Sequence, residues 1–124
     1  MAKSVHNDVL DGAFDIIRNT CDKMTACSQE PVNFTEANAT FALADAAMTS
    51  GDFSIADGDM SGRKVTIGQK SGVNVDADGT ANHVALLDTA GSRLLYVTTA
   101  TAQVLTTGNT MTFNTWDIEI ADPA

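Results

Sequence analysis

The sequence has 124 residues, of which 44% are hydrophobic and 19% are charged, a length and composition typical of one globular domain with its own core. Its 16 Asp and Glu residues against 7 Lys and Arg give a formal net charge of -9. Such a chain lacks the basic surface that phosphate groups require, so we expect no nucleic-acid partner and no binding to an anionic membrane. No apolar run approaches the roughly 20 residues that span a bilayer, and we expect synthesis in the cytoplasm without an export signal.

The first predicted element is an amphipathic helix over residues 7–24, with Asn7 as its N-cap. Its apolar residues recur at spacings of three and four, which is the pattern of a helix with one buried face. These residues are Leu10, Ala13, Phe14, Ile17, Cys21 and Met24. We expect residues 1–24 to form an N-terminal arm and this helix, and residues 25–124 to form the body of the same single domain.

After residue 24 the helical period disappears, and the chain becomes rich in Thr, Val and Gly with turn residues at short intervals, which is typical of β structure. Residues 29–38 are interpreted as a connection. The predicted strands cover residues 40–44, 52–55, 64–69, 73–75, 82–88, 93–99, 103–106, 110–113 and 116–120. One helix followed by eight or nine short strands predicts a mainly β fold, either a sandwich or a barrel.

The clearest local signal is a hairpin formed by 82–88 and 93–99, whose four-residue connection contains Gly91, a residue able to adopt a positive φ. Both runs are apolar at successive positions, which predicts strands covered on both faces. Residues 116–120 alternate instead, with Trp116 and Ile118 on one face and acidic residues on the other. This alternation predicts a strand with one face in water.

Catalysis by a nucleophile requires a base within hydrogen-bond reach. The candidates His6, His83, Cys21 and Cys27 carry no flanking catalytic signature, and the two cysteines lack the spacing of a zinc site or a redox pair. We expect both cysteines to be buried free thiols. The sequence therefore predicts a protein that is not an enzyme and uses no cofactor.

Two acidic turns are weak candidates for calcium. Asp57, Asp59 and Ser61 resemble the front half of a calcium-binding loop, although the Glu expected at the twelfth position is missing. Asp76 and Asp78 form a second, shorter acidic turn. Asp in such turns usually accepts hydrogen bonds from the local backbone, so we predict no bound metal.

Several segments resemble a known family when they are taken together. They are SVHNDVLDGAFDII, TEANATFALAD, SGDFSIADGDMSGRKVTI, HVALLDTAGSRLLYVTT and NTWDIEIADP. They resemble small structural proteins that are encoded among the virion genes of tailed bacteriophages. The resemblance implies a decoration or cement protein on the capsid surface of the virion, with the major capsid protein as its partner and a homo-oligomeric state.

Given that resemblance, we assign the N-terminal helix to the contact with the capsid or with a sister copy, through Val9, Leu10, Phe14 and Ile17. The alternative is that Leu10, Phe14 and Ile17 only pack the helix on its own β body. Two other functions stay open, namely a tail, neck or fibre-associated virion subunit and a carbohydrate- or receptor-binding β module.

Overall fold

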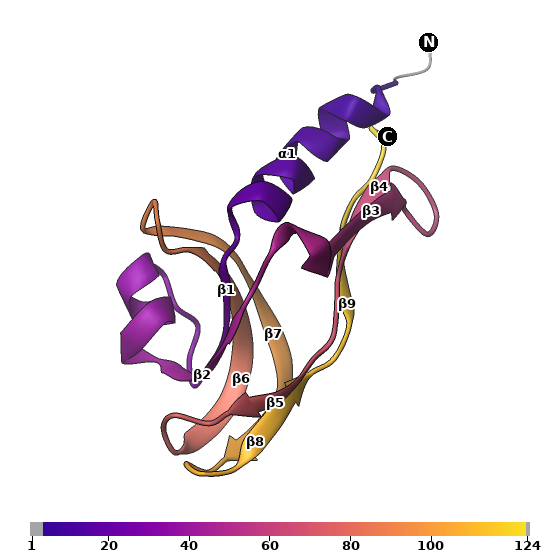
Figure 1. The fold of residues 1–124 in the computed structure, drawn as a ribbon. Helices are drawn as coiled ribbons and strands as arrows, with labels where there is room; N and C mark the ends of the chain where they lie inside the picture. Colours follow the sequence, from indigo (N-terminus) through magenta and orange to yellow (C-terminus); the bar gives the residue numbers. More distant parts are fainter. Residues whose placement is uncertain (1–3, 124) are drawn as a thin grey trace.

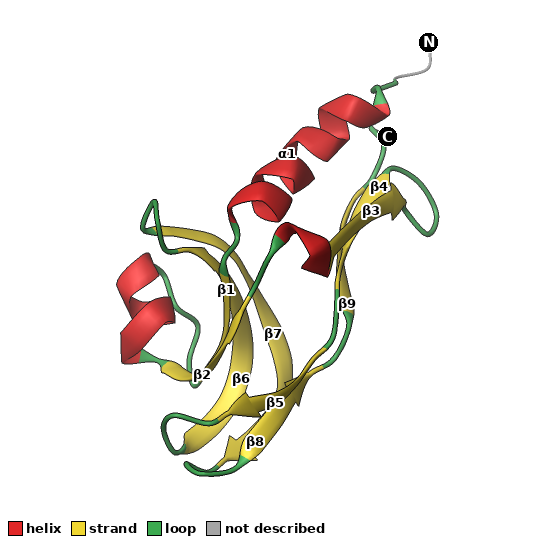
Figure 2. Ribbon diagram, viewed as in Figure 1, coloured by secondary structure: helices red, strands yellow, loops and turns green. Residues whose placement is uncertain are grey.

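The computed structural model describes residues 4–123 and is mainly β, with one long N-terminal helix and antiparallel sheets (Figures 1 and 2). The helices within these residues are α1 (Asn7–Thr20), a short π-helix (Glu36–Thr40) and a 3-10 turn (Ser50–Asp52). The strands are β1 (Lys23–Cys27), β2 (Ala42–Ala47), β3 (Phe53–Asp57), β4 (Arg63–Ile67), β5 (Lys70–Asn74), β6 (Gly79–Asp88), β7 (Arg93–Leu105), β8 (Thr110–Phe113) and β9 (Trp116–Ile120).

The strands form three sheets, in the orders β2-β1-β6-β7, β3-β4-β9 and β5-β8. An isolated bridge between Ala44 and Val75 links the first sheet to the chain just after β5. The sheets do not close into a barrel, because no ladder among the described strands joins β7 to β8 or β9. The mainly β class is thus confirmed, and a closed barrel is ruled out.

Helix α1 is shorter than the sequence pattern predicted. His6, and not Asn7, caps it, since the His6 Nδ1 atom accepts a hydrogen bond from the Asp8 amide at 3.0 Å. At its other end the Cys21 amide donates to the Ile17 carbonyl oxygen, and Cys21 itself is extended. The prediction of a helix up to Met24 was therefore wrong, and the expected boundary after residue 24 falls inside β1.

Strand β1 explains this error. It lies between β2 and β6, and its last four residues are all buried. A strand buried on both faces shows no alternation of polar and apolar residues, so a short apolar run of this kind resembles the end of a helix.

The hairpin of β6 and β7 is confirmed, with Asp88 paired to Arg93 beside the turn. The positive φ of 53° is at Ser92 and not at Gly91 as expected. A Cβ atom at Gly91 would instead lie 2.7 Å from the Asp88 Oδ2 atom, so a side chain there would displace this carboxylate. The Asp88 carboxylate accepts hydrogen bonds from the Gly91 amide and the Arg93 side chain, so the turn closes around this carboxylate.

Strand β7 is one element where two strands, 93–99 and 103–106, were predicted. The ladder with β6 is irregular in between, because the pairs His83–Thr99 and Ala81–Gln103 leave residues 100–102 opposite Asn82 alone. This bulge bends β7 without ending it, so a single strand continues to Leu105.

Buried side chains form two clusters, one on each face of the four-stranded sheet. The main core lies between this sheet, α1 and the other strands, and includes Phe14, Met24 and Leu86. The smaller cluster contains Ala85 and Leu87 and is covered by the segment that carries the π-helix. Burial on both faces is therefore confirmed for β6, whereas it was wrong for β7, whose residues 94–97 are only half-buried at the edge of the sheet. The water-exposed face of β9 is confirmed, since Asp117 and Glu119 are exposed beside buried Ile118.

Candidate functional site

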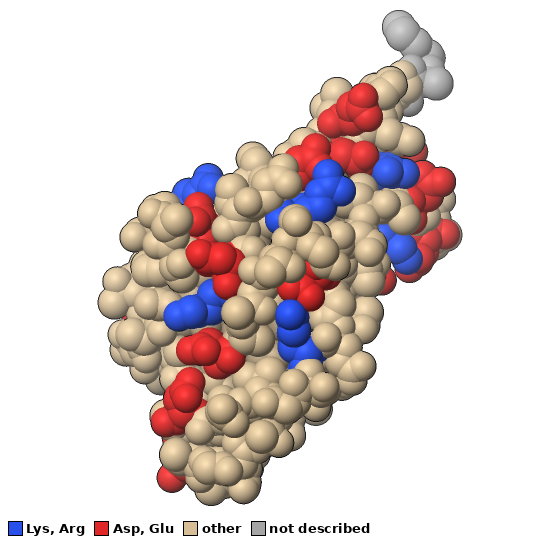
Figure 3. All heavy atoms as spheres, in the orientation of Figure 1, with Lys and Arg blue, Asp and Glu red and all other residues tan. Residues whose placement is uncertain are grey.

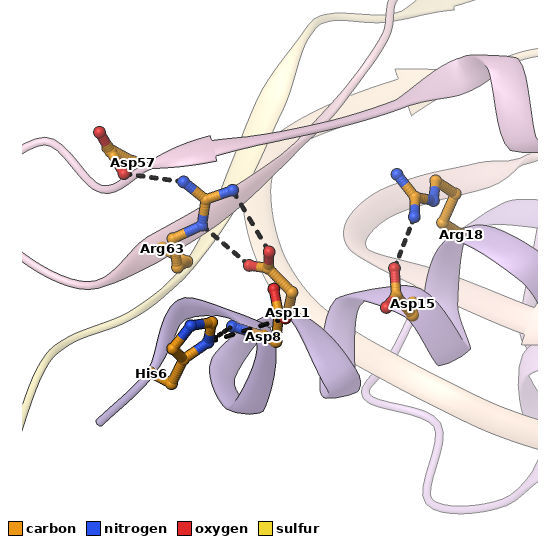
Figure 4. A network of polar contacts seen from close by, with 7 residues as sticks. All are labelled: His6, Asp8, Asp11, Asp15, Arg18, Asp57 and Arg63. Atoms are coloured by element: carbon orange, nitrogen blue, oxygen red, sulfur yellow. Dashed lines mark hydrogen bonds and ion pairs between the residues drawn. The ribbon is translucent and has the colours of Figure 1, made fainter.

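Helix α1 is held on the β body by an arginine at the start of β4. The Arg63 Nε and Nη2 atoms donate to the two Asp11 carboxylate oxygens at 2.9 and 3.3 Å, and Nη1 donates to Asp57 at 2.7 Å (Figure 4). The hydrogen bond to Asp11, followed by that to Asp57, raises the pKa of the Arg63 guanidinium above its usual value. A forked pair of this kind fixes orientation as well as distance, so α1 is oriented relative to β3 and β4.

The two faces of α1 differ in burial. Phe14 and Ile17 are 1% and 9% exposed and belong to the main core, and Leu10 is half-buried. Val9 and Ile16 are 69% and 51% exposed. The sequence left open whether Phe14 and Ile17 contact a partner or only pack α1 on its own β body. The structure shows that both pack on the β body, whereas Val9 is accessible to a partner.

Ile16 was not among the predicted contact residues, although it follows Val9 at a spacing of seven and a helical projection would have placed both on one side. It lies at an apolar groove of about 400 Å³ between α1, β7 and β9. Leu95, Tyr96 and Ile120 line the opposite wall. We call the surface formed by Val9, Ile16 and this groove the α1 surface.

We expect the Arg63→Gln substitution to loosen α1, because it removes both bonds to Asp11. Hydrogen exchange of the α1 amides should become faster than in the unmodified chain. Arg18→Gln is the control, since its ion pair with Asp15 lies within α1 between side chains that are 37% and 44% exposed, and exposed pairs contribute little. Equal exchange rates in the two variants would contradict the anchoring role of Arg63.

A second groove, of about 430 Å³, lies between the β6–β7 side and the β8–β9 side. Thr98, Thr101 and Gln103 line one wall, and Asn114 and Trp116 line the other. The Trp116 ring lies against Tyr96, with ring centroids 5.9 Å apart, and its Nε1 atom is buried without a hydrogen-bond acceptor. We call this the β7 groove.

The first acidic turn is engaged in local contacts. Asp57 pairs with Arg63, and the Asp59 carboxylate lies 2.8 Å from the Lys64 Nζ atom. The Ser61 hydroxyl oxygen accepts a hydrogen bond from the Asp122 amide at 3.3 Å. These contacts fasten the β3–β4 turn to its neighbours, and the two carboxylates face cationic side chains.

In the second acidic turn, the Asp78 carboxylate accepts a hydrogen bond from the Thr107 amide at 2.7 Å, which lowers the pKa of Asp78. The Asp76 amide donates to the Leu43 carbonyl oxygen. Within residues 4–123, no group of three or more His, Cys, Asp or Glu side chains is placed to hold a metal ion. Both turns therefore have a structural explanation that involves no cation.

The cysteines and histidines are not arranged as a nucleophile and its base. Cys27 stands opposite His83 in the ladder between β1 and β6. The Cys27 thiol, however, contacts Thr25 and the Ala37 carbonyl oxygen, and His83 Nδ1 lies 2.6 Å from the Asn82 amide oxygen. Both cysteines are free and buried, as expected.

Burial raises the pKa of Cys21 to about 11 and raises that of Cys27 as well, because the thiolate is disfavoured away from water. We therefore expect both thiols to react slowly with a disulfide reagent at pH 7.5 in the folded chain and rapidly in denaturant. The rate for the folded chain should rise with pH as the thiolate fraction of each thiol grows. Equal rates in folded and unfolded chains at pH 7.5 would show that the thiols are accessible.

Comparison with known proteins found no family model that matches the chain, and no similar curated protein or solved structure. Among the described residues, none of the helices combines the length and apolar character needed to cross a bilayer.

Proposed function

We propose that this chain is a decoration or cement protein that binds the outside of a tailed-bacteriophage capsid and stabilises the head. The observation that carries the proposal is the α1 surface: exposed Ile16 lines an apolar groove, and exposed Val9 lies two helical turns before it on the same side of a helix that Arg63 pairs to the β body. Contiguous exposed apolar surface marks a site of interaction. The resemblance to small virion proteins supplies the partner, the major capsid protein.

The mechanism in this proposal is adhesion without chemistry. Each copy bridges neighbouring capsid subunits, and many weak contacts become strong together because they act on one lattice. The net charge of -9 keeps the free protein soluble before assembly. We also infer that the main core makes the body an open sandwich, rigid enough to transmit force between subunits.

The absence of catalysis is part of the same proposal. It is supported by the burial of both thiols and by the engagement of the acidic turns in local contacts. Turnover of any substrate at the β7 groove would contradict it.

The primary experiment is to locate the chain in intact particles by electron microscopy and to count its copies. A copy number comparable to that of the lattice subunits, with density on the outer capsid surface, is the expected result. Density in the tail or neck with only a few copies would replace the proposal by the tail-subunit alternative. Signals on a glycan array, with or without calcium, would favour a carbohydrate-binding module.

The Val9→Ser/Ile16→Ser variant tests the surface itself. We expect it to fold normally, because both side chains are exposed, and to lose most of its binding to capsids that lack the protein. Val32→Ser is the matched control, since Val32 is 76% exposed and belongs to the segment over the other face of the sheet. Equal binding of both variants would exclude the α1 surface as the contact.

A further inference from the structure

Charged residues are distributed unevenly along this acidic chain. Residues 94–116 contain no Asp, Glu, Lys or Arg, although such residues make up 19% of the sequence. This uncharged segment includes nearly all of β7, all of β8 and the first residue of β9. On the face shown in Figure 3, charged side chains lie over α1, β3 and β4 and along the left side of the molecule, whereas the lower right part around β8 shows none.

Strand β7 is also an edge strand with little of the usual protection. In the described part of the chain it is paired only with β6, so the backbone groups along its other side have no strand partner. Residues 99–104 are all exposed, with Val104 at 75%. Natural proteins usually protect a long edge strand from pairing by charged residues, proline or a bulge. Of these three features, the free edge of β7 has only a bulge, at residues 100–102.

The other edge strands of the larger sheets differ from β7. Strand β3 has five residues and ends at Asp57, which pairs with Arg63. Strand β2 carries Asp45, and its Ala44 is bridged to Val75. Strand β9, the remaining edge strand, carries Asp117 and Glu119. Among the described strands of the two larger sheets, the long uncharged edge is therefore specific to β7.

The uncharged β7 edge indicates what kind of partner fits it, and the carboxylate that lines the adjoining β7 groove, that of Asp117, is on its other wall. Two copies with a net charge of -9 repel each other, and the repulsion is weakest where they meet through surfaces without carboxylates. A basic partner would instead be attracted to the carboxylates that this segment lacks. For an acidic partner, the absence of these carboxylates reduces the electrostatic repulsion at the contact. A second copy of the chain is such an acidic partner.

We propose that the free edge of β7 joins two copies of this chain by main-chain hydrogen bonds between strands, beside the β7 groove. The strand contributes backbone donors and acceptors, and its Thr, Ala and Val side chains can approach without leaving a buried charge unpaired. This contact is distinct from the α1 surface and does not depend on the proposed function, because it forms in the purified protein. Where the chain is on a capsid, the same contact would link neighbouring copies laterally.

The test compares two variants that each add two lysines to an exposed strand edge. Thr101→Lys/Val104→Lys changes the β7 edge, and Ser54→Lys/Ala56→Lys changes exposed positions on β3. Both shift the net charge by the same amount, so only the location differs. Sedimentation equilibrium up to millimolar concentration should show the unmodified chain and the β3 variant associating, with the association constant of the β7 variant at least about tenfold lower.

Salt provides a second readout. Contact between like-charged copies through an uncharged surface should strengthen when ionic strength rises from about 0.01 to about 0.15 M, as the Debye length falls from about 30 to about 8 Å. Contact through ion pairs would weaken over the same range.

Hydrogen exchange of the unmodified chain places the contact without any substitution. Amides of 99–104 should become protected as the protein concentration rises, while those of β3 stay unchanged. A chain that stays monomeric at millimolar concentration would overturn the proposal, as would protection confined to other segments or equal association of the two lysine variants. Such results would leave the capsid proposal standing, since that one is tested by location in particles.

Discussion

Phe14→Ala is expected to lower the free energy of unfolding by about 3–5 kcal/mol, the usual cost of removing a buried aromatic ring. Phe14 is 1% exposed and lies in the main core. The substitution removes apolar contacts and leaves a cavity between α1 and the sheets, which the surrounding strands can fill only in part. Chemical denaturation at equilibrium measures the change directly.

Ile16→Ala is the control for this prediction, because Ile16 is on the same helix but 51% exposed. Its effect on unfolding should stay within about 0.5 kcal/mol, while its effect on capsid binding should be the larger of the two. A similar loss of stability in both variants would mean that the two faces of α1 are not separated into a core face and a contact face.

Gly62→Ala is expected to be the most damaging single methyl addition in the chain. Gly62 has a φ of 70°, and a Cβ atom there would lie 1.9 Å from the Ile120 carbonyl oxygen. The left-handed conformation costs a residue with a Cβ about 1–2 kcal/mol. The steric overlap should add about 1–3 kcal/mol, because backbone atoms at the end of β9 would have to move.

Gly72→Ala separates these two contributions. Gly72 has a φ of 66° and no atom within 4 Å of the added Cβ position, so this variant should show the conformational cost alone. Thermal and denaturant unfolding of both variants gives the difference. Equal losses of stability would show that the end of β9 moves aside freely.

Local sequence signals predicted those elements that depend on short-range chemistry. The alternation in residues 116–120 corresponds to β9, and the apolar runs on either side of the 89–92 connection correspond to β6 and β7. In each case the order of polar and apolar residues along the strand indicates which side chains face water and which face the core, and this order can be seen in neighbouring residues. The start of α1 was predicted within one residue for the same reason.

The errors occurred where distant parts of the chain meet. Met24 was assigned to the helix because its spacing from Cys21 fits a helical face, whereas pairing with β2 and β6 makes it part of a strand. Leu10 and Phe14 belong to one amphipathic pattern, and only the packing of α1 decided that Phe14 is fully buried and Leu10 half-buried. Hydrophobic periodicity shows that a face is apolar and does not show what covers it.

The sequence by itself determined a mainly β domain behind one amphipathic helix, an acidic surface, and a long stretch without charge. Only the tertiary structure decided that Arg63 meets Asp11, that β7 is an edge, and that the sheets stay open. The physical reason is that composition and periodicity are properties of neighbouring residues, whereas edges, grooves and ion pairs between elements arise from contacts across the chain, such as that between Asp11 and Arg63.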